Sequence, residues 1–246
     1  MPTRSRPCMP AWIWPRITDP MAAAPRSPFL RNFAKYWLKP LTLIALLIPG
    51  LWLIWLWVQV FTFNPTALGF DPVARTHHFL GDTALRVLIV SLMVTPFRDL
   101  TKWAPIIQVR RRIGLAAFFY ALAHVLAYLA FDLRGSLPGL WEDVVERIYI
   151  TLGMAAFLML IPLAITSNNA MIRRMGALAW RRLHTLVYPI AVLAVFHYGF
   201  MVKGNQMGPW IHGAVIALLL GYRAWRGISR PDSSFRTRLR QVTGAA

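Results

Sequence analysis

Six apolar stretches, separated by short polar or charged segments, account for most of the chain. They cover residues 41–63, 79–97, 113–131, 149–166, 183–202 and 209–225. Each is close to the roughly 20 residues that an α-helix needs to cross the hydrocarbon core of a bilayer. The pattern therefore predicts an all-α integral membrane protein with six transmembrane helices in one bundle.

The composition agrees with a membrane protein. Of the 246 residues, 57% are hydrophobic and 15% are charged, which is too apolar for a soluble domain of this length. The net charge of +18 comes from basic residues between the apolar stretches rather than along one face, so it indicates membrane topology and not nucleic-acid binding. The single cysteine, Cys8, excludes a disulfide framework within one chain.

The loop charges alternate, and this alternation predicts the orientation. The second and fourth loops and the C-terminal segment are rich in arginine, whereas the third loop contains four acidic residues. Because cytoplasmic loops carry an excess of Lys and Arg, we expect both termini to be cytoplasmic. The predicted organisation is a basic, disordered tail (1–40), a six-helix domain (41–226) and a basic cytoplasmic tail (227–246). We expect no flavin- or nicotinamide-binding reductase domain, so a soluble electron donor is a separate protein.

Histidines inside the apolar stretches are the candidate functional residues, because imidazole at membrane depth is costly without a partner. His124 lies 124 − 113 = 11 residues into the third stretch, and His197 lies 197 − 183 = 14 residues into the fifth. Both helices run outward, so the two histidines differ in depth by about 5 Å. Matched depth on two helices is what bis-histidine ligation of a b-type haem requires, and the alternative is a histidine that only hydrogen-bonds another helix.

His184 shares the fifth stretch with His197, and 197 − 184 = 13 residues separate them, or about 20 Å along a helix. The depth-matched position on the third helix is Arg111, which cannot ligate iron. Thirteen steps leave the two side chains about 140° apart, although Pro189 can kink the helix between them. Two readings stay open: His184 serves a second cofactor, such as a haem, quinone or flavin near the cytoplasmic face, or it is structural. The candidates for holding a haem propionate or a flavin phosphate on this side are Arg110, Arg111, Arg112, Arg181 and Arg182.

The remaining polar residues near the outer face have simpler interpretations. His77, His78 and His212 are expected to be structural. Asp82 and Arg86 are spaced for an i,i+4 ion pair.

Four segments together resemble a known family. They read LGDTALRVLIVSLMVTPFRD, RRRIGLAAFFYALAHVLAYLAFD, RIYITLGMAAFLMLIPLAITS and MGALAWRRLHTLVYPIAVLAVFHYGFMVKG. In this order, with a histidine in the second segment and two in the fourth, they resemble the MsrQ (YedZ) family of the ferric-reductase-like transmembrane superfamily. The resemblance covers about residues 40–226.

The resemblance implies a membrane electron-transfer subunit rather than a complete enzyme. It implies haem b, with His124, His184 and His197 at the positions of the family's histidines, and FMN. It further implies electrons drawn from the membrane quinone pool, and delivery to a periplasmic, molybdopterin-containing methionine sulfoxide reductase that repairs oxidised envelope proteins. A flavin supplied by a cytoplasmic flavin reductase is an alternative electron donor. The expected location is the bacterial inner membrane.

Two other functions stay open from the residues alone. One is a stand-alone ferric or cupric reductase that needs no protein partner. The other is a proton-coupled transporter in which the histidines relay protons, although the scarcity of acidic residues inside the apolar stretches argues against it.

Overall fold

The computed structural model describes residues 32–34, 36–202 and 206–229, and within these ranges the chain forms helices, turns and loops without a β-strand. Most of the two predicted tails lies outside the described residues. Within the described part, five helical stretches are long and apolar enough to cross a membrane, and they agree with the first five predicted spans. They are Leu38–Thr62, Pro72–Thr101, Ala104–Asp132, Ile148–Ile165 and Ala177–Met201.

Three of these stretches are single helices, and two are composite. Helices α2, α3 and α6 are Leu38–Thr62, Pro72–Thr101 and Ile148–Ile165. The third stretch joins the 3₁₀-helix η1 (Ala104–Val109) to α4 (Arg110–Phe131). The fifth joins α8 (Ala177–Leu183), the 3₁₀ turn η2 (His184–Leu186) and α9 (Val187–Met201).

The sixth predicted span corresponds to α10 (Met207–Ser229), which carries Arg223 and Arg226 in its second half. This helix is not one of the five stretches that are apolar enough to cross a membrane. The sixth span therefore stays a prediction, as does the cytoplasmic location of both termini. In keeping with the predicted orientation, we call the end of the bundle with the arginine-rich loops the inner end and the opposite end the outer end.

Several connecting segments that the sequence analysis treated as loops are helical. Helix α3 begins at Pro72, seven residues before the predicted span, because the Asp71 side chain accepts a hydrogen bond from the Ala74 amide at 2.9 Å. His77 and His78 therefore lie inside α3. At the outer end, α5 (Leu137–Glu146) connects α4 to α6, and α7 (Asn169–Met175) lies in the fourth loop.

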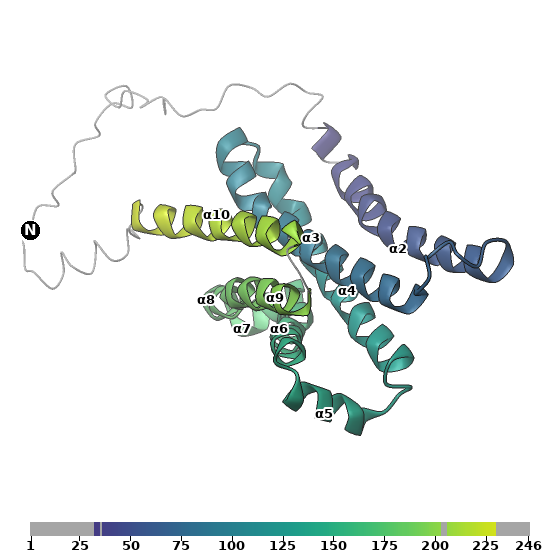
Figure 1. Cartoon of the computed structure of the whole chain (residues 1–246). Helices are drawn as coiled ribbons and strands as arrows, with labels where there is room; N and C mark the ends of the chain where they lie inside the picture. Colours follow the sequence, from purple (N-terminus) through teal and green to yellow (C-terminus); the bar gives the residue numbers. More distant parts are fainter. Residues whose placement is uncertain (1–31, 35, 203–205, 230–246) are drawn as a thin grey trace, which may run out of the picture.

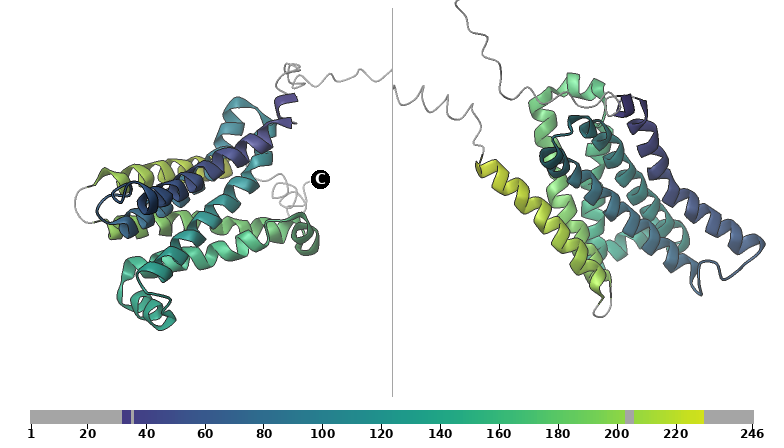
Figure 2. Two further views of the ribbon diagram at one scale, coloured as in Figure 1. Left: turned by 90° about the vertical axis from the view of Figure 1, so that its right-hand side faces the viewer. Right: turned by 90° about the horizontal axis from the view of Figure 1, so that it is seen from above.

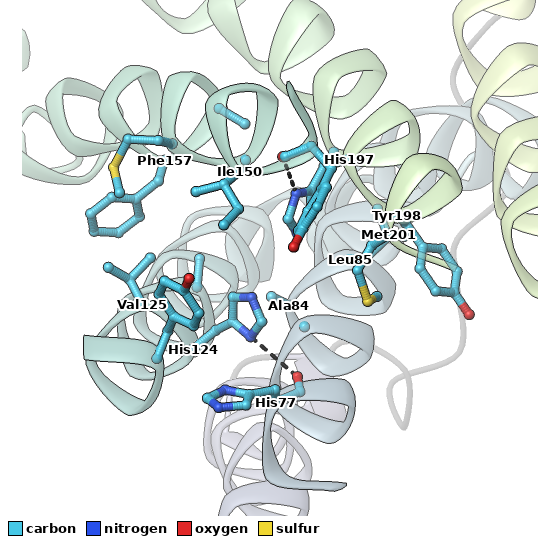
Figure 3. Close-up of a pocket in the computed structure, with 18 of the residues that line it drawn as sticks. His77, Ala84, Leu85, His124, Val125, Ile150, Phe157, His197, Tyr198 and Met201 are labelled. Carbon is cyan, nitrogen blue, oxygen red and sulfur yellow. Dashed lines mark hydrogen bonds between the residues drawn. The ribbon is translucent and has the colours of Figure 1, made fainter. Parts of the chain in front are cut away.

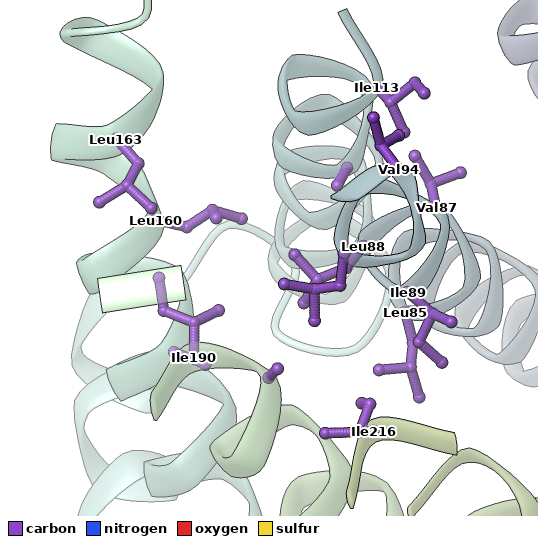
Figure 4. Packing of buried hydrophobic residues seen from close by; sticks show 14 of the residues in the cluster. Leu85, Val87, Leu88, Ile89, Val94, Ile113, Leu160, Leu163, Ile190 and Ile216 are labelled. Carbon is purple, nitrogen blue, oxygen red and sulfur yellow. The ribbon is translucent and has the colours of Figure 1, made fainter. Parts of the chain in front are cut away.

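Helix α3 is the centre of the bundle (Figures 1 and 2). In the most apolar 18-residue segment of α3, half of the residues are buried inside the protein. The corresponding fraction in α2, which lies at the edge of the bundle, is 6%. The buried side chains gather where α3, α4, α6, α9 and α10 meet (Figure 4). They include Leu88, Ile113, Leu160, Ile190 and Ile216. The bundle therefore has a packed interior, with α2 facing outward.

Gaps in the hydrogen-bond ladders of two proline-containing helices are filled by side chains from other helices. Pro49 lies inside α2, and one residue later the Tyr120 hydroxyl is inserted into the helical ladder. It accepts a hydrogen bond from the Gly50 amide at 2.9 Å and donates one to the Leu46 carbonyl at 2.7 Å. An inserted hydroxyl of this kind opens the i→i−4 hydrogen bond and joins α2 to α4.

The second gap lies in α3. Pro96 has no amide hydrogen, so the Leu92 carbonyl loses its helical donor. The Arg223 guanidinium of α10 supplies the missing hydrogen bond through Nη2 at 2.7 Å. The same guanidinium lies over the Tyr188 ring of α9, 5.2 Å from its centroid. Arg223 therefore links α10 to both neighbouring helices.

Candidate functional site

A cavity of about 400 Å³ lies between α3, α4, α6 and α9 and reaches the outer end of the bundle (Figure 3). Its volume is within the range of sites that bind small molecules and cofactors. The walls are mostly apolar, and side chains such as Leu88, Val125, Phe157 and Ile190 line them. A planar, largely apolar group that binds there contacts mostly apolar side chains.

The two histidines predicted to ligate haem face this cavity. His124 comes from α4 and His197 from α9, and their ring centroids are 6.2 Å apart, with the planes at 78°. Two metal–imidazole bonds of about 2 Å each, plus the distance from each ring centre to its nitrogen, add up to on the order of 6 Å. The separation therefore suits one iron atom held between the two rings.

Hydrogen bonds orient both imidazoles for ligation through Nε2. His124 Nδ1 donates to the His77 carbonyl of α3 at 3.1 Å, and His197 Nδ1 donates to the Tyr149 carbonyl of α6 at 2.6 Å. A carbonyl oxygen can only accept, so Nδ1 carries the proton in each neutral ring and Nε2 keeps its lone pair. Metal-ligating histidines usually have such a second hydrogen bond, which fixes the ring orientation.

Two glycines provide the space for these rings. A Cβ atom on Gly153 of α6 would lie 2.7 Å from His197 Nδ1, and one on Gly81 of α3 would lie 3.4 Å from His124 Cε1. Glycine inside a helix destabilises it by about 1 kcal/mol relative to alanine. Beside each histidine, the space that glycine leaves for the imidazole ring offsets this cost. Neither glycine was among the residues predicted from the sequence, although a glycine within an apolar helical stretch is a signal of close packing.

Polar groups surround the outer end of the cavity. His77, interpreted as structural, contacts the site directly: its ring lies edge-on to the His124 ring at 6.0 Å, and its Nε2 is 2.6 Å from Asp132 Oδ2. The predicted Asp82–Arg86 ion pair is confirmed, with 3.2 Å between the charged groups. Among the described residues, no group of three or more His, Cys, Asp or Glu side chains is placed to hold a bare metal ion. His124 and His197 are the residues that would hold a haem in this cavity.

His184 is not among the residues that line this cavity. Its Nε2 is 3.1 Å from the Thr166 hydroxyl, and its ring stacks on Trp180 with 4.0 Å between centroids. The Trp180 indole in turn donates to the Thr166 carbonyl at 2.9 Å. His184 is therefore packed into a separate polar cluster at the inner end of the bundle.

The five candidate arginines also lie away from the cavity, at its inner side. Arg111 Nη2 donates to Asn169 Oδ1 at 2.5 Å, and Arg112 Nη1 donates to the Lys39 carbonyl at 2.8 Å. Arg181 Nε bonds the Ala177 carbonyl of its own helix at 3.3 Å. Arg110 begins α4, and Arg182 lies near the end of α8. The structure brings His124 and His197 together, whereas His184 and the arginines are elsewhere.

The fold and the two-histidine cavity define a class of helical membrane protein, and sequence comparison supports it. Residues 80–195 match the family described as ferric reductase like transmembrane component. This segment contains His124 and His184 and ends two residues before His197.

Curated relatives define the particular family. The heme-binding subunit MsrQ of protein-methionine-sulfoxide reductase from Xanthomonas euvesicatoria pv. vesicatoria (strain 85-10) is 46% identical over 198 residues, 80% of this chain and 90% of the relative. The protein of the same name from Caulobacter vibrioides is 44% identical over 160 residues, 65% of this chain and 76% of the relative. The chain belongs to the MsrQ family, and the resemblance identified from its sequence is confirmed.

Proposed function

We propose that this chain passes electrons across the membrane through one haem b held between His124 and His197, and delivers them to a protein-methionine-sulfoxide reductase. The observation that carries the proposal is the pair of imidazole rings, 6.2 Å apart, with both Nδ1 atoms bonded to backbone carbonyls. Haem bound there supplies reversible one-electron transfer. The name shared by the curated relatives, which describes a heme-binding subunit of that reductase, supports the same role.

The protein's own residues contribute ligation, orientation and solvent exclusion. The His77 and Tyr149 carbonyls hold the two imidazoles in one tautomer and increase the basicity of Nε2. Gly81 and Gly153 allow α3 and α6 to approach the rings closely. The apolar walls keep water from the metal and lower the local dielectric constant, which tunes the redox potential.

The finer parts of the proposal concern the donors and the partner. Electrons come from a membrane quinol, which is oxidised to the quinone, or from a cytoplasmic flavin reductase. The acceptor is a periplasmic, molybdopterin-containing catalytic subunit on which methionine sulfoxide is reduced. The membrane is the bacterial inner membrane, with both termini cytoplasmic and six spans. Support comes from the alternation of loop charge and from the family resemblance.

The inner end of the bundle is where we place FMN or a second cofactor. Arg110, Arg111, Arg112, Arg181 and Arg182 supply positive charge there. A second cavity of about 480 Å³ nearby is lined by Arg98, Lys102 and Arg226 and by Asp99, whose carboxylate pairs with Arg98 and Arg226. Guanidinium groups are suited to a phosphate or a propionate. The contacts of His184 with Thr166 and Trp180 favour a structural role over ligation, because its Nε2 already has a partner.

Visible spectroscopy of the detergent-purified protein tests the haem site. A dithionite-reduced minus oxidised spectrum should show a b-type α-band, and the pyridine haemochrome assay should give about one haem per chain. His124→Ala and His197→Ala should each abolish the Soret absorption, because each removes one of the two side chains that would hold the haem. His184→Ala should keep it, and His212→Ala serves as a control on α10.

Other outcomes have definite meanings. Full haem retention in His197→Ala contradicts the ligand assignment. About two haems per chain means that His184 ligates a second one. Colourless protein contradicts the electron-transfer function and favours the transporter.

A further inference from the structure

Helix α5 has three distinct faces. At about 100° per residue, Leu137, Trp141 and Val145 fall within an arc of roughly 80°. Their side chains are 65%, 71% and 66% exposed, although all three are large and apolar. Glu142 and Glu146 follow on the next arc, at roughly 140–180°, and are also exposed. The third face packs against the protein.

The packed face attaches α5 to the histidine cavity. Leu140 lines the cavity, and Asp143 is buried. The Asp143 carboxylate accepts a hydrogen bond from the Tyr128 hydroxyl of α4 and pairs with Arg147 at 3.1 Å. Hydrogen bonding with Tyr149, followed by the charge of Asp143, raises the pKa of Arg147, so this residue stays cationic. These contacts fix which way the other two faces point.

The position of α5 in the chain places it at the membrane surface. Phe131 ends α4 and Ile148 begins α6, and both helices belong to candidate membrane spans. Figure 1 shows α5 at one end of the bundle, between the ends of these two helices. Arg147 alone separates α5 from α6, and Ile148 is itself exposed. The exposed Val145 and Ile148 therefore lie three residues apart in the sequence, where α5 meets a candidate membrane span.

We propose that α5 is an interfacial helix whose apolar face, Leu137, Trp141 and Val145, is inserted into the outer leaflet of the membrane, while Glu142 and Glu146 face water. An amphipathic helix lying in the interface needs an apolar arc beside a charged arc, and tryptophan is enriched at that level. Because the third face carries Leu140 and Asp143, α5 forms a lipid-anchored outer wall of the histidine cavity. The apolar arc is then covered by lipid and is not available to a soluble partner.

Spin labelling of single cysteines in reconstituted protein tests this inference. Cys8 is the only cysteine in the chain, so Cys8→Ser provides a background in which Val145→Cys and Glu142→Cys are labelled one at a time. Both positions are exposed, so the label does not disturb the core. The full chain is reconstituted into vesicles of phosphatidylethanolamine and phosphatidylglycerol, and collision rates with oxygen and with a water-soluble nickel chelate are measured. Oxygen concentrates in lipid, whereas the chelate stays in water.

The expected result is a reversal between the two positions. The label at residue 145 should collide more often with oxygen, and the label at residue 142 more often with the chelate. A label at residue 145 that is as accessible to the chelate as that at residue 142 overturns the proposal and leaves the apolar face for a protein partner. A label at residue 145 that is shielded from both reagents, with spectral broadening that increases with the protein-to-lipid ratio, also overturns it, because a second copy then covers the face.

Discussion

A single methyl group at residue 153 should disrupt the histidine site. Gly153→Ala places a Cβ atom 2.7 Å from His197 Nδ1, so the imidazole has to move away from the Tyr149 carbonyl and from the position facing His124. Overpacking of this kind costs about 1–3 kcal/mol, which corresponds to roughly a 5- to 150-fold loss of haem affinity. The ratio of Soret to protein absorbance in purified protein measures the loss.

Two other glycines provide comparisons for this prediction. Gly199→Ala lies on α9, two residues from His197, where a Cβ atom meets nothing within 4 Å, so haem content should not change. Gly81→Ala should have a smaller effect than Gly153→Ala, because its nearest contact is 3.4 Å. Equal haem content in all three variants would show that haem binding does not depend on the position of the His197 imidazole beside Gly153.

The residues that face the cavity were predictable only in part. His124 and His197 could be paired from the sequence because depth along a helix depends only on the rise per residue. The Tyr149 and His77 carbonyls and the two glycines depend on how each helix is rotated about its axis. Packing against neighbouring helices sets that rotation. In an almost uniformly apolar helix, the order of apolar and polar residues does not predict which side faces the cavity.

At the scale of helices, the contact between Arg223 and the carbonyl left free by Pro96 predicts a non-additive pair of substitutions. Arg223→Met should destabilise the protein by about 1–3 kcal/mol, because a buried acceptor loses a charged donor. In a Pro96→Ala background the amide of residue 96 can bond the Leu92 carbonyl, so Arg223→Met should cost roughly 1 kcal/mol less. Thermal unfolding in detergent, measured on the two single variants and the double variant, provides the coupling energy.

Arg226→Met is the matched control for this cycle. Arg226 also lies on α10, but it pairs with Asp99 and not with the Leu92 carbonyl. The effects of Arg226→Met and Pro96→Ala on the free energy of unfolding should therefore be additive. If Arg223→Met is equally additive, Arg223 does not compensate for the proline.

The helices themselves were more predictable than their connections. The first five apolar stretches correspond to the five candidate spans because length and hydropathy are local properties of the sequence. Helix α5 was missed because its ten residues are too short to span a membrane and its acidic residues resemble those of a loop. What reveals its helical nature is the Ser136 cap and the separation of apolar and acidic residues around the axis.

For the whole molecule, the contacts of α10 bear on whether the chain crosses the membrane a sixth time. Near the start of α10, the His212 ring lies 5.7 Å from the Tyr198 ring, close to the end of α9. Near its other end, Arg226 pairs with Asp99, close to the end of α3. The interval of 226 − 212 = 14 residues corresponds to about 21 Å of helix, roughly two thirds of the hydrocarbon thickness. Helix α10 thus runs beside the bundle from its outer end to its inner end.

We therefore expect α10 to be the sixth span, even though its arginines make it less apolar than the others. Arg223 bonds the Leu92 carbonyl and Arg226 pairs with Asp99, so neither charge has to face lipid. Reporter fusions in cells measure the topology. Alkaline phosphatase fused after Met201 should be active, because this point lies outside, and green fluorescent protein fused after Ser229 should fluoresce, because this point lies inside. If both junctions report the same side, α10 lies along the bundle without crossing the membrane.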